Sequence, residues 1–72
     1  MSSEVFPSDR ERADWFRRID LARFGQEIPV RQLCAEARIR ESTYFRWLKS
    51  ERVPRLKSLN ALAAALSRMV QP

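Results

Sequence analysis

The chain contains no histidine, one cysteine and one glycine among its 72 residues. Without histidine, and with Cys34 as the lone thiol, it lacks the residues that most zinc sites and nucleophile–base pairs need. It also has neither a Gly-rich phosphate loop nor a suitable pair of carboxylates, so we expect no enzyme, no cofactor and no metal site. A single cysteine cannot form an internal disulfide, which is typical of a reducing compartment, and we expect the protein in the cytoplasm.

Long apolar runs and strand-like segments are missing too. No apolar stretch approaches the roughly 20 residues of a membrane span, and no signal-peptide pattern opens the chain. No segment alternates apolar and polar residues over the length of a strand. The 44% of apolar residues is enough for one small core. The composition therefore predicts a single all-α domain that makes no contact with a membrane.

The expected organisation is a short arm followed by one domain. Residues 1–8 are expected to form a flexible N-terminal arm, and residues 9–70 the domain. A first helix is expected to begin with a cap on Ser8 or Asp9 and to run to about Phe24, where Gly25 supplies a left-handed stop. Two further helices are expected over residues 30–37 and 41–50. Pro54 is expected to end the following loop, and a fourth helix with an apolar stripe from Leu56 to Leu66 is expected after it, with Val70 as a further candidate for the stripe.

Apolar periodicity assigns one side of each helix to the core. These core positions are Trp15, Phe16, Ile19, Ala22, Val30, Leu33, Cys34, Ala37, Ile39, Tyr44, Trp47, Leu48, Leu56, Leu59, Leu62, Ala63 and Leu66. Leu21 and Phe24 fall nearly opposite the core side of the first helix. We expect them to be covered either by Val5 and Phe6 of the arm or by another subunit.

The expected helix over residues 41–50 has a polar side that coincides with the basic part of the chain. That polar side consists of Ser42, Thr43, Arg46, Lys49 and Ser50. Residues 1–37 carry six basic and seven acidic side chains, whereas residues 38–57 carry seven basic and two acidic ones. The excess charge is either a solvated surface or a contact for a phosphate backbone. Its position on one side of a short helix after a tight turn favours DNA.

Several residues in a fixed order also match a known family. They are Ile28, Leu33, Cys34, Ile39, Thr43, Tyr44, Trp47, Pro54, Leu56, Leu59, Leu62, Ala63, Ala65 and Leu66. In this pattern residues 28–66 resemble the phage-repressor and Cro type of helix-turn-helix, the XRE or lambda-repressor-like family. The resemblance implies a compact four-to-five-helix domain. Arg38 stands where the family's turn usually has glycine in a left-handed conformation, which is costly for other residues, so we expect the turn to differ slightly in shape.

The resemblance implies that the helix over residues 41–50 enters the major groove of double-stranded DNA. Arg46 is the leading candidate to read a base, because its guanidinium can donate to both acceptors of a guanine edge. Further candidates for base contacts are Ser42, Thr43, Glu41 and Phe45, for which capping, the helix dipole or packing are alternative roles. The expected phosphate contacts are Arg40, Lys49, Ser50, Arg52, Arg55 and Lys57, with Arg31 and Gln32 at the start of the second helix.

The function implied by the resemblance is that of a small transcriptional regulator, a repressor that occupies a promoter as a homodimer on an inverted repeat. Phages and other mobile elements encode such proteins, and no small-molecule effector is evident. Candidate dimer contacts are Met69 and Val70, with Leu21 and Phe24 as the alternative. The competing hypothesis is a protein-interaction module on the same scaffold, antitoxin-like or polymerase-binding, whose basic face binds an acidic protein.

Overall fold

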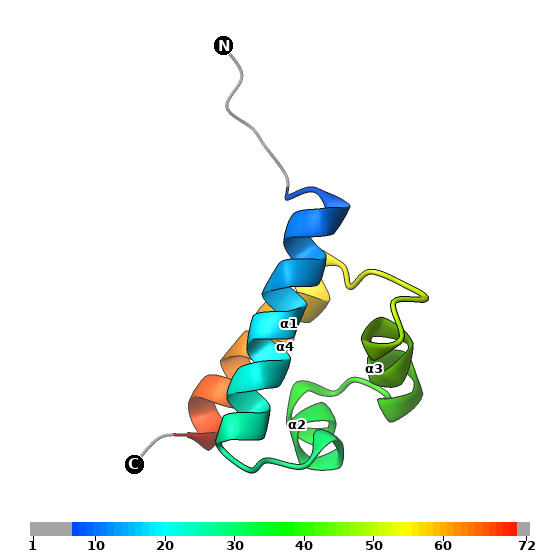
Figure 1. The fold of residues 1–72 in the computed structure, drawn as a ribbon. Helices are drawn as coiled ribbons and strands as arrows, with labels where there is room; N and C mark the ends of the chain where they lie inside the picture. The colour runs from blue at the N-terminus through cyan, green and yellow to red at the C-terminus, as the bar shows by residue number, and fades with distance from the viewer. Residues whose placement is uncertain (1–6, 71–72) are drawn as a thin grey trace.

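A computed structural model describes residues 7–70 as a bundle of four helices. They are α1 (Asp9–Gly25), α2 (Val30–Ala37), α3 (Glu41–Leu48) and α4 (Leu56–Met69). The helices α1 and α4 run side by side, α2 packs against α4, and α3 packs against α2 (Figure 1). Residues 7–70 contain no strand, which confirms the all-helical expectation. Residues 1–6 of the expected arm, including Val5 and Phe6, lie outside the described residues.

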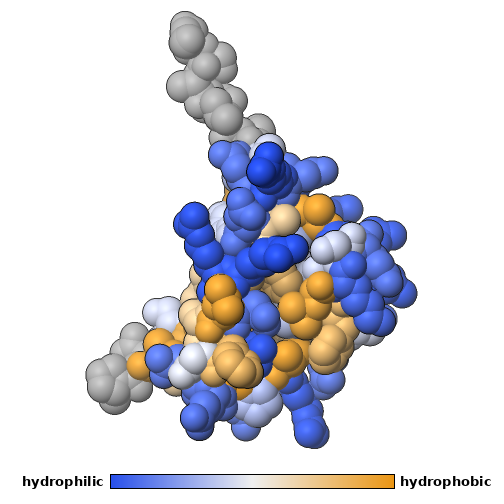
Figure 2. Space-filling view, viewed as in Figure 1, coloured by the Kyte–Doolittle hydropathy of each residue, from blue (hydrophilic) through white to orange (hydrophobic). Residues whose placement is uncertain are grey.

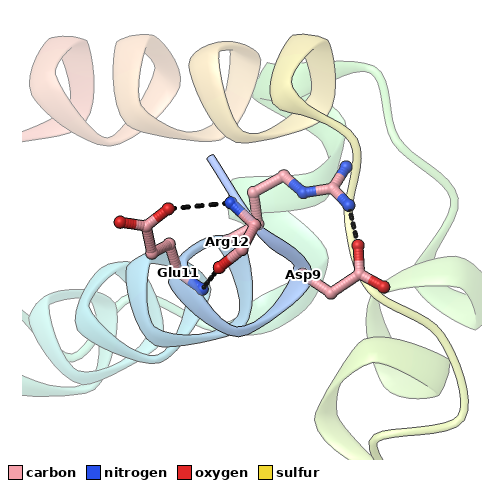
Figure 3. A network of polar contacts seen from close by, with 4 residues as sticks. Asp9, Glu11 and Arg12 are labelled. Carbon is pink, nitrogen blue, oxygen red and sulfur yellow. Dashed lines mark hydrogen bonds and ion pairs between the residues drawn. The ribbon is translucent and has the colours of Figure 1, made fainter. Parts of the chain in front are cut away.

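The start of α1 is fixed by a reciprocal capping box. The Ser8 hydroxyl accepts a hydrogen bond from the Glu11 amide at 3.1 Å, and the Ser8 amide donates to Glu11 Oε1 at 2.8 Å. Arg12 adds an ion pair with Asp9 in the same turn (Figure 3). Two of the amide groups that a helix leaves unpaired at its start are thereby satisfied. This arrangement confirms Ser8 as the cap.

The first three helices end in the same way, each with a non-glycine residue in the left-handed conformation. Glu27 has φ 59°, Arg38 has φ 60° and Ser50 has φ 63°. After α2, for example, the Arg38 amide donates to Ala35 O and the next amide donates to Cys34 O, which is a Schellman motif. Arg38 thus adopts the left-handed conformation although it is not a glycine, where we expected its side chain to alter the shape of the turn. The same ending stops α3 at Leu48, two residues before the expected limit.

Gly25 does not provide the left-handed stop that we expected of it. It is the last residue of α1, and Glu27 adopts the positive φ instead. The amide of Glu27 donates to Phe24 O at 3.0 Å, and that of Ile28 donates to Arg23 O at 3.1 Å. The helix therefore ends at Gly25 without a positive φ there, and the left-handed residue follows two positions later.

We expect Gly25→Ala and Arg38→Gly each to raise the free energy of unfolding by about 0.5–1 kcal/mol. A Cβ at Gly25 meets no atom within 4 Å, so alanine adds helix propensity without a clash. Glycine at position 38 removes the cost of a left-handed side chain. Urea unfolding measures both changes. Arg38→Ala is the matched control, since it removes the same side chain but keeps the Cβ, and an equal gain there would contradict the explanation.

The core lies between α1, α4 and the pair α2–α3. Its buried apolar residues are Phe16, Ile19, Ile28, Leu33, Cys34, Tyr44, Trp47, Leu59, Leu62 and Ala65. Two expected core positions are wrong: Ala22 is exposed, and the side chain of Leu48 is 40% exposed. In place of Ala22, the inward side of α1 continues through Asp20 and Arg23, which are half-buried. A polar contact with α3 therefore replaces apolar packing in this turn.

That contact is a hydrogen-bond network between α1 and α3. Tyr44 Oη donates to Asp20 Oδ1 at 2.7 Å, and Arg23 Nε donates to the same oxygen at 3.0 Å. Arg23 Nη1 also donates to the carbonyl of Ile28 at 2.8 Å. Burial, followed by the hydrogen bond and charge of Asp20, raises the pKa of the Tyr44 phenol. The network fixes the rotation of α3 relative to α1.

Cys34 is a core residue of small volume in α2. Its side chain is 1% exposed, and burial, with a smaller contribution from the charge of Glu41, raises the pKa of its thiol to about 11. A thiol that is both buried and protonated is a poor nucleophile. Cys34 therefore contributes to packing between helices.

Candidate nucleic-acid interface

The orientation of α3 is set by two aromatic side chains on its inner side. The ring of Phe16 in α1 lies 4.9 Å from that of Tyr44 and 5.6 Å from that of Trp47, both in edge-to-face geometry. Because Tyr44 and Trp47 are buried, the opposite arc of the helix must face solvent. That arc carries Ser42, Phe45, Arg46 and Lys49, all of which are exposed.

The remaining candidates on α3 differ in how accessible they are. Glu41 is exposed in the first turn, whereas Thr43 is half-buried on the flank of the helix. Ser50 lies beyond the end of α3, where its amide donates to Trp47 O at 3.1 Å. Its side chain is exposed. Of the five expected base contacts, the structure brings Ser42, Phe45 and Arg46 together on one solvent-facing arc.

The basic side chains of residues 38–57 form no ion pair within the described residues. The expected phosphate contacts Arg40, Lys49, Arg52, Arg55 and Lys57 are all exposed. Within residues 7–70, the three ion pairs are Arg12–Asp9, Arg23–Asp20 and Arg68–Glu36, and none of them involves this segment. Figure 2 shows hydrophilic side chains over part of α3 and the following loop, with hydrophobic patches beside them. The positive charge of the segment is therefore available to an anionic ligand.

Two helix starts add to the positive potential. The residues before α2 and α4 are Pro29 and Arg55, neither of which caps its helix with a side chain, and neither first turn contains an acidic residue. The partial positive charge of these helix ends is thus uncompensated. Arg31 and Gln32 are exposed in the first turn of α2, as a contact with phosphate requires.

The candidate dimer contacts differ in exposure. Met69 is half-buried and packs against the core, whereas Val70 is 40% exposed. Val70 borders a shallow groove between α1 and α4 that also includes Ala22, Ala63 and Leu66. Leu21 and Phe24 on α1 are 69% and 71% exposed.

A half-open pocket, which helical periodicity did not predict, lies next to α3. It has a volume of about 310 Å³ and lies between α1, the end of α3 and the loop to α4. Phe16, Trp47 and Pro54, all buried, contribute to its lining, and Leu21 and Leu48 line it as well. Arg17, which was not among the expected site residues, and Arg52 complete the lining. One signal in the sequence was Leu21, an apolar residue that periodicity left outside the core side of α1.

Comparison with protein-family models, with curated proteins and with solved structures finds no match to this chain. None of the helices within residues 7–70 is long and apolar enough to cross a membrane. Among the same residues, no three His, Cys, Asp or Glu side chains are grouped closely enough to hold a metal ion.

Proposed function

We propose that the protein is a sequence-specific double-stranded DNA-binding regulator of transcription that uses α2 and α3 as a helix-turn-helix. The observation that carries the proposal is the outer arc of α3, where Ser42, Phe45 and Arg46 are exposed beside basic residues that have no acidic partner within the described residues. The three-residue turn with left-handed Arg38 supports the assignment. The likeness to the lambda-repressor-like family remains part of this proposal.

In the proposed complex α3 lies in the major groove. Arg46 donates two hydrogen bonds to a guanine, and Ser42 and Phe45 contact neighbouring base edges, Phe45 through a thymine methyl group. Arg40, Arg52, Arg55 and Lys57 contact phosphates on both sides of the groove, and the uncapped start of α2 contacts another with Arg31 or Gln32. One such domain covers few base pairs, so we propose a homodimer on an inverted repeat, acting as a repressor by occupying a promoter.

We place the dimer contact at the end of α4, where Val70 borders the groove between α1 and α4. Because Met69 packs against the core, a substitution there perturbs folding as well as assembly. Val70→Glu is therefore the sharper test. It is expected to abolish cooperative binding to a duplex with two half-sites while binding to a single half-site persists.

Selection of bound sequences from a random duplex pool tests the function directly. Enrichment of one motif, with half-sites about one helical turn apart, is the expected result. A failure to bind any duplex at low salt would overturn the proposal and favour a protein-interaction module, because phosphate contacts alone support non-specific binding under that condition.

Arg52→Ala and Arg55→Ala are each expected to weaken binding to the selected and to a random duplex by the same factor. Each removes one phosphate contact and its released counterion, so the slope of log affinity against log salt concentration falls by about one unit per substitution. Titrations at several salt concentrations measure that slope. Arg68→Ala is the control, because Arg68 Nε donates to Glu36 Oε2 of α2 at 2.8 Å and is not a proposed phosphate contact. This substitution is expected to leave the slope unchanged.

A further inference from the structure

Four large apolar side chains are exposed on one face of α1 and α3. Five such residues are exposed within residues 7–70, and four of them lie on these two helices: Leu21 at 69%, Phe24 at 71%, Phe45 at 42% and Leu48 at 40%. We call them the α1/α3 apolar face. Figure 2 shows hydrophobic side chains gathered over α1 and α3 on the side facing the viewer.

The two pairs meet at Leu21 and Leu48. These two residues line the same pocket, so α1 and α3 each contribute apolar side chains to it. Phe24 lies one turn after Leu21, and Phe45 lies one turn before Leu48. The hydrogen bond from Tyr44 to Asp20 holds the two helices together at this level. A rigid apolar surface with a pocket in it is typical of a site that accepts an anchoring side chain of another protein.

Val5 and Phe6, which were one expected cover for Leu21 and Phe24, lie outside the described residues. Pro7, the first described residue, lies beside Trp15 and Arg18, in a different hollow from the pocket that Leu21 lines.

The charge around the pocket indicates what kind of segment fits. Arg17 and Arg52 line it, and neither forms an ion pair within the described residues. The one acidic residue in the lining, Asp20, already accepts hydrogen bonds from Tyr44 and Arg23. Outside the lining, the nearest acidic residues in sequence are Glu27, three residues after Phe24, Glu41, one turn before Phe45, and Glu51, next to Arg52. Within the lining two arginines accompany one aspartate, so the pocket itself carries a net positive charge.

We propose that the α1/α3 apolar face binds an amphipathic helix of a partner protein, with apolar side chains on one side and acidic residues along its flanks. An apolar anchor fills the pocket over Phe16 and Trp47, and carboxylates of the partner pair with Arg17 and Arg52. This is the helix-in-groove mode of peptide recognition. A second copy of the chain fits less well, because the unpaired arginines of the two faces would meet.

The proposal has a regulatory consequence, which rests on the proposed DNA-binding function. Phe45 lies both on this face and on the outer arc of α3, and Arg52 is both a pocket residue and a proposed phosphate contact. A helix bound here occupies part of the surface that approaches the duplex. The partner helix and DNA therefore compete for the protein.

The direct test uses two synthetic peptides of about 18 residues, five helical turns, with leucine on one side and either glutamate or lysine on the other. Fluorescence anisotropy with the full chain, in the absence of DNA, is expected to show binding of the glutamate peptide and at least about tenfold weaker binding of the lysine peptide. The Arg17→Glu, Arg52→Glu double variant is expected to reverse that preference. Equal affinity for both peptides would overturn the proposal.

Single substitutions locate the site. Leu21→Glu and Leu48→Glu are each expected to weaken binding of the glutamate peptide at least about tenfold. Ala64→Glu is the matched control, since it adds the same charge at an exposed position on α4 away from the pocket, and a loss of the same size there would count against the site. Sedimentation velocity tests whether a second copy of the chain covers the face instead. A wild-type protein that is dimeric and a Leu21→Glu variant that is monomeric would show that it does.

The competition experiment separates the two proposals. Displacement of a selected duplex by the glutamate peptide supports both. Peptide binding by a protein that binds no duplex would leave this inference standing and overturn the DNA-binding function. A protein that binds the duplex, does not bind the peptide and is not displaced by it would support the DNA-binding function and overturn this inference.

Discussion

Arg46→Ala is expected to weaken binding to the preferred duplex by about 1–3 kcal/mol and to relax the preference at one base pair. Arg46 is exposed on the outer arc of α3, one turn from Ser42 and next to Phe45. A guanidinium in that position can donate to both acceptors of a guanine, and no other side chain on the arc has that geometry. Quantitative binding to duplexes that vary at each position measures the effect.

The controls for Arg46 separate reading of a base from attraction to phosphate. Arg46→Lys is expected not to restore the preference, because an ammonium group cannot form the paired hydrogen bonds. The free energy of unfolding of Arg46→Ala is expected to stay within about 0.5 kcal/mol of the wild type, as for other exposed residues. A uniform loss of affinity on all sequences would show that Arg46 contacts the backbone of the DNA instead.

Tyr44→Phe is expected to lower the free energy of unfolding by about 1–2 kcal/mol at neutral pH. The substitution keeps the buried ring and its packing on Phe16 but removes the hydrogen bond that Tyr44 donates to Asp20. Asp20 keeps its contact with Arg23, so the loss stays at the lower end of the range for bonds to charged groups. Urea unfolding measures the change.

The hydrogen bond between Tyr44 and Asp20 also predicts that the free energy of unfolding falls at alkaline pH. The pKa of Tyr44 is raised in the folded state, so the unfolded chain releases the phenol proton first, near pH 10. The contribution of Tyr44 to stability is therefore complete below about pH 10 and is lost as the pH rises toward the folded-state pKa. Tyr44 is the only tyrosine, so tyrosinate absorbance reports its titration alone. A titration with an unshifted midpoint would contradict the network, and Tyr44→Phe is expected to lack this part of the alkaline destabilisation.

Local sequence determined the helices and much of the core. The apolar repeat of Leu59, Leu62 and Leu66 predicted α4, and the apolar positions within residues 30–37 and 41–50 predicted two short helices with a turn between them. The cap at Ser8 followed from the chemistry of a few neighbouring residues. Each of these features depends on contacts within one or two turns, which is why the sequence pattern was sufficient.

The tertiary structure decided which parts of each helix remain uncovered. Periodicity gives the direction in which Leu48 points from the axis of α3. Only the position of α1 shows that Leu48 lines a pocket together with Leu21. Periodicity also predicted that Ala22 lies in the core. In the structure Ala22 is exposed, and the half-buried Asp20 and Arg23 occupy that side of α1, where Asp20 accepts a hydrogen bond from Tyr44 of α3. The Asp20–Tyr44 bond joins residues 24 positions apart, and no local pattern encodes such a pair. The α1/α3 apolar face follows from the same cause, because the packing of distant segments, and not the repeat within one helix, determines which side chains are exposed.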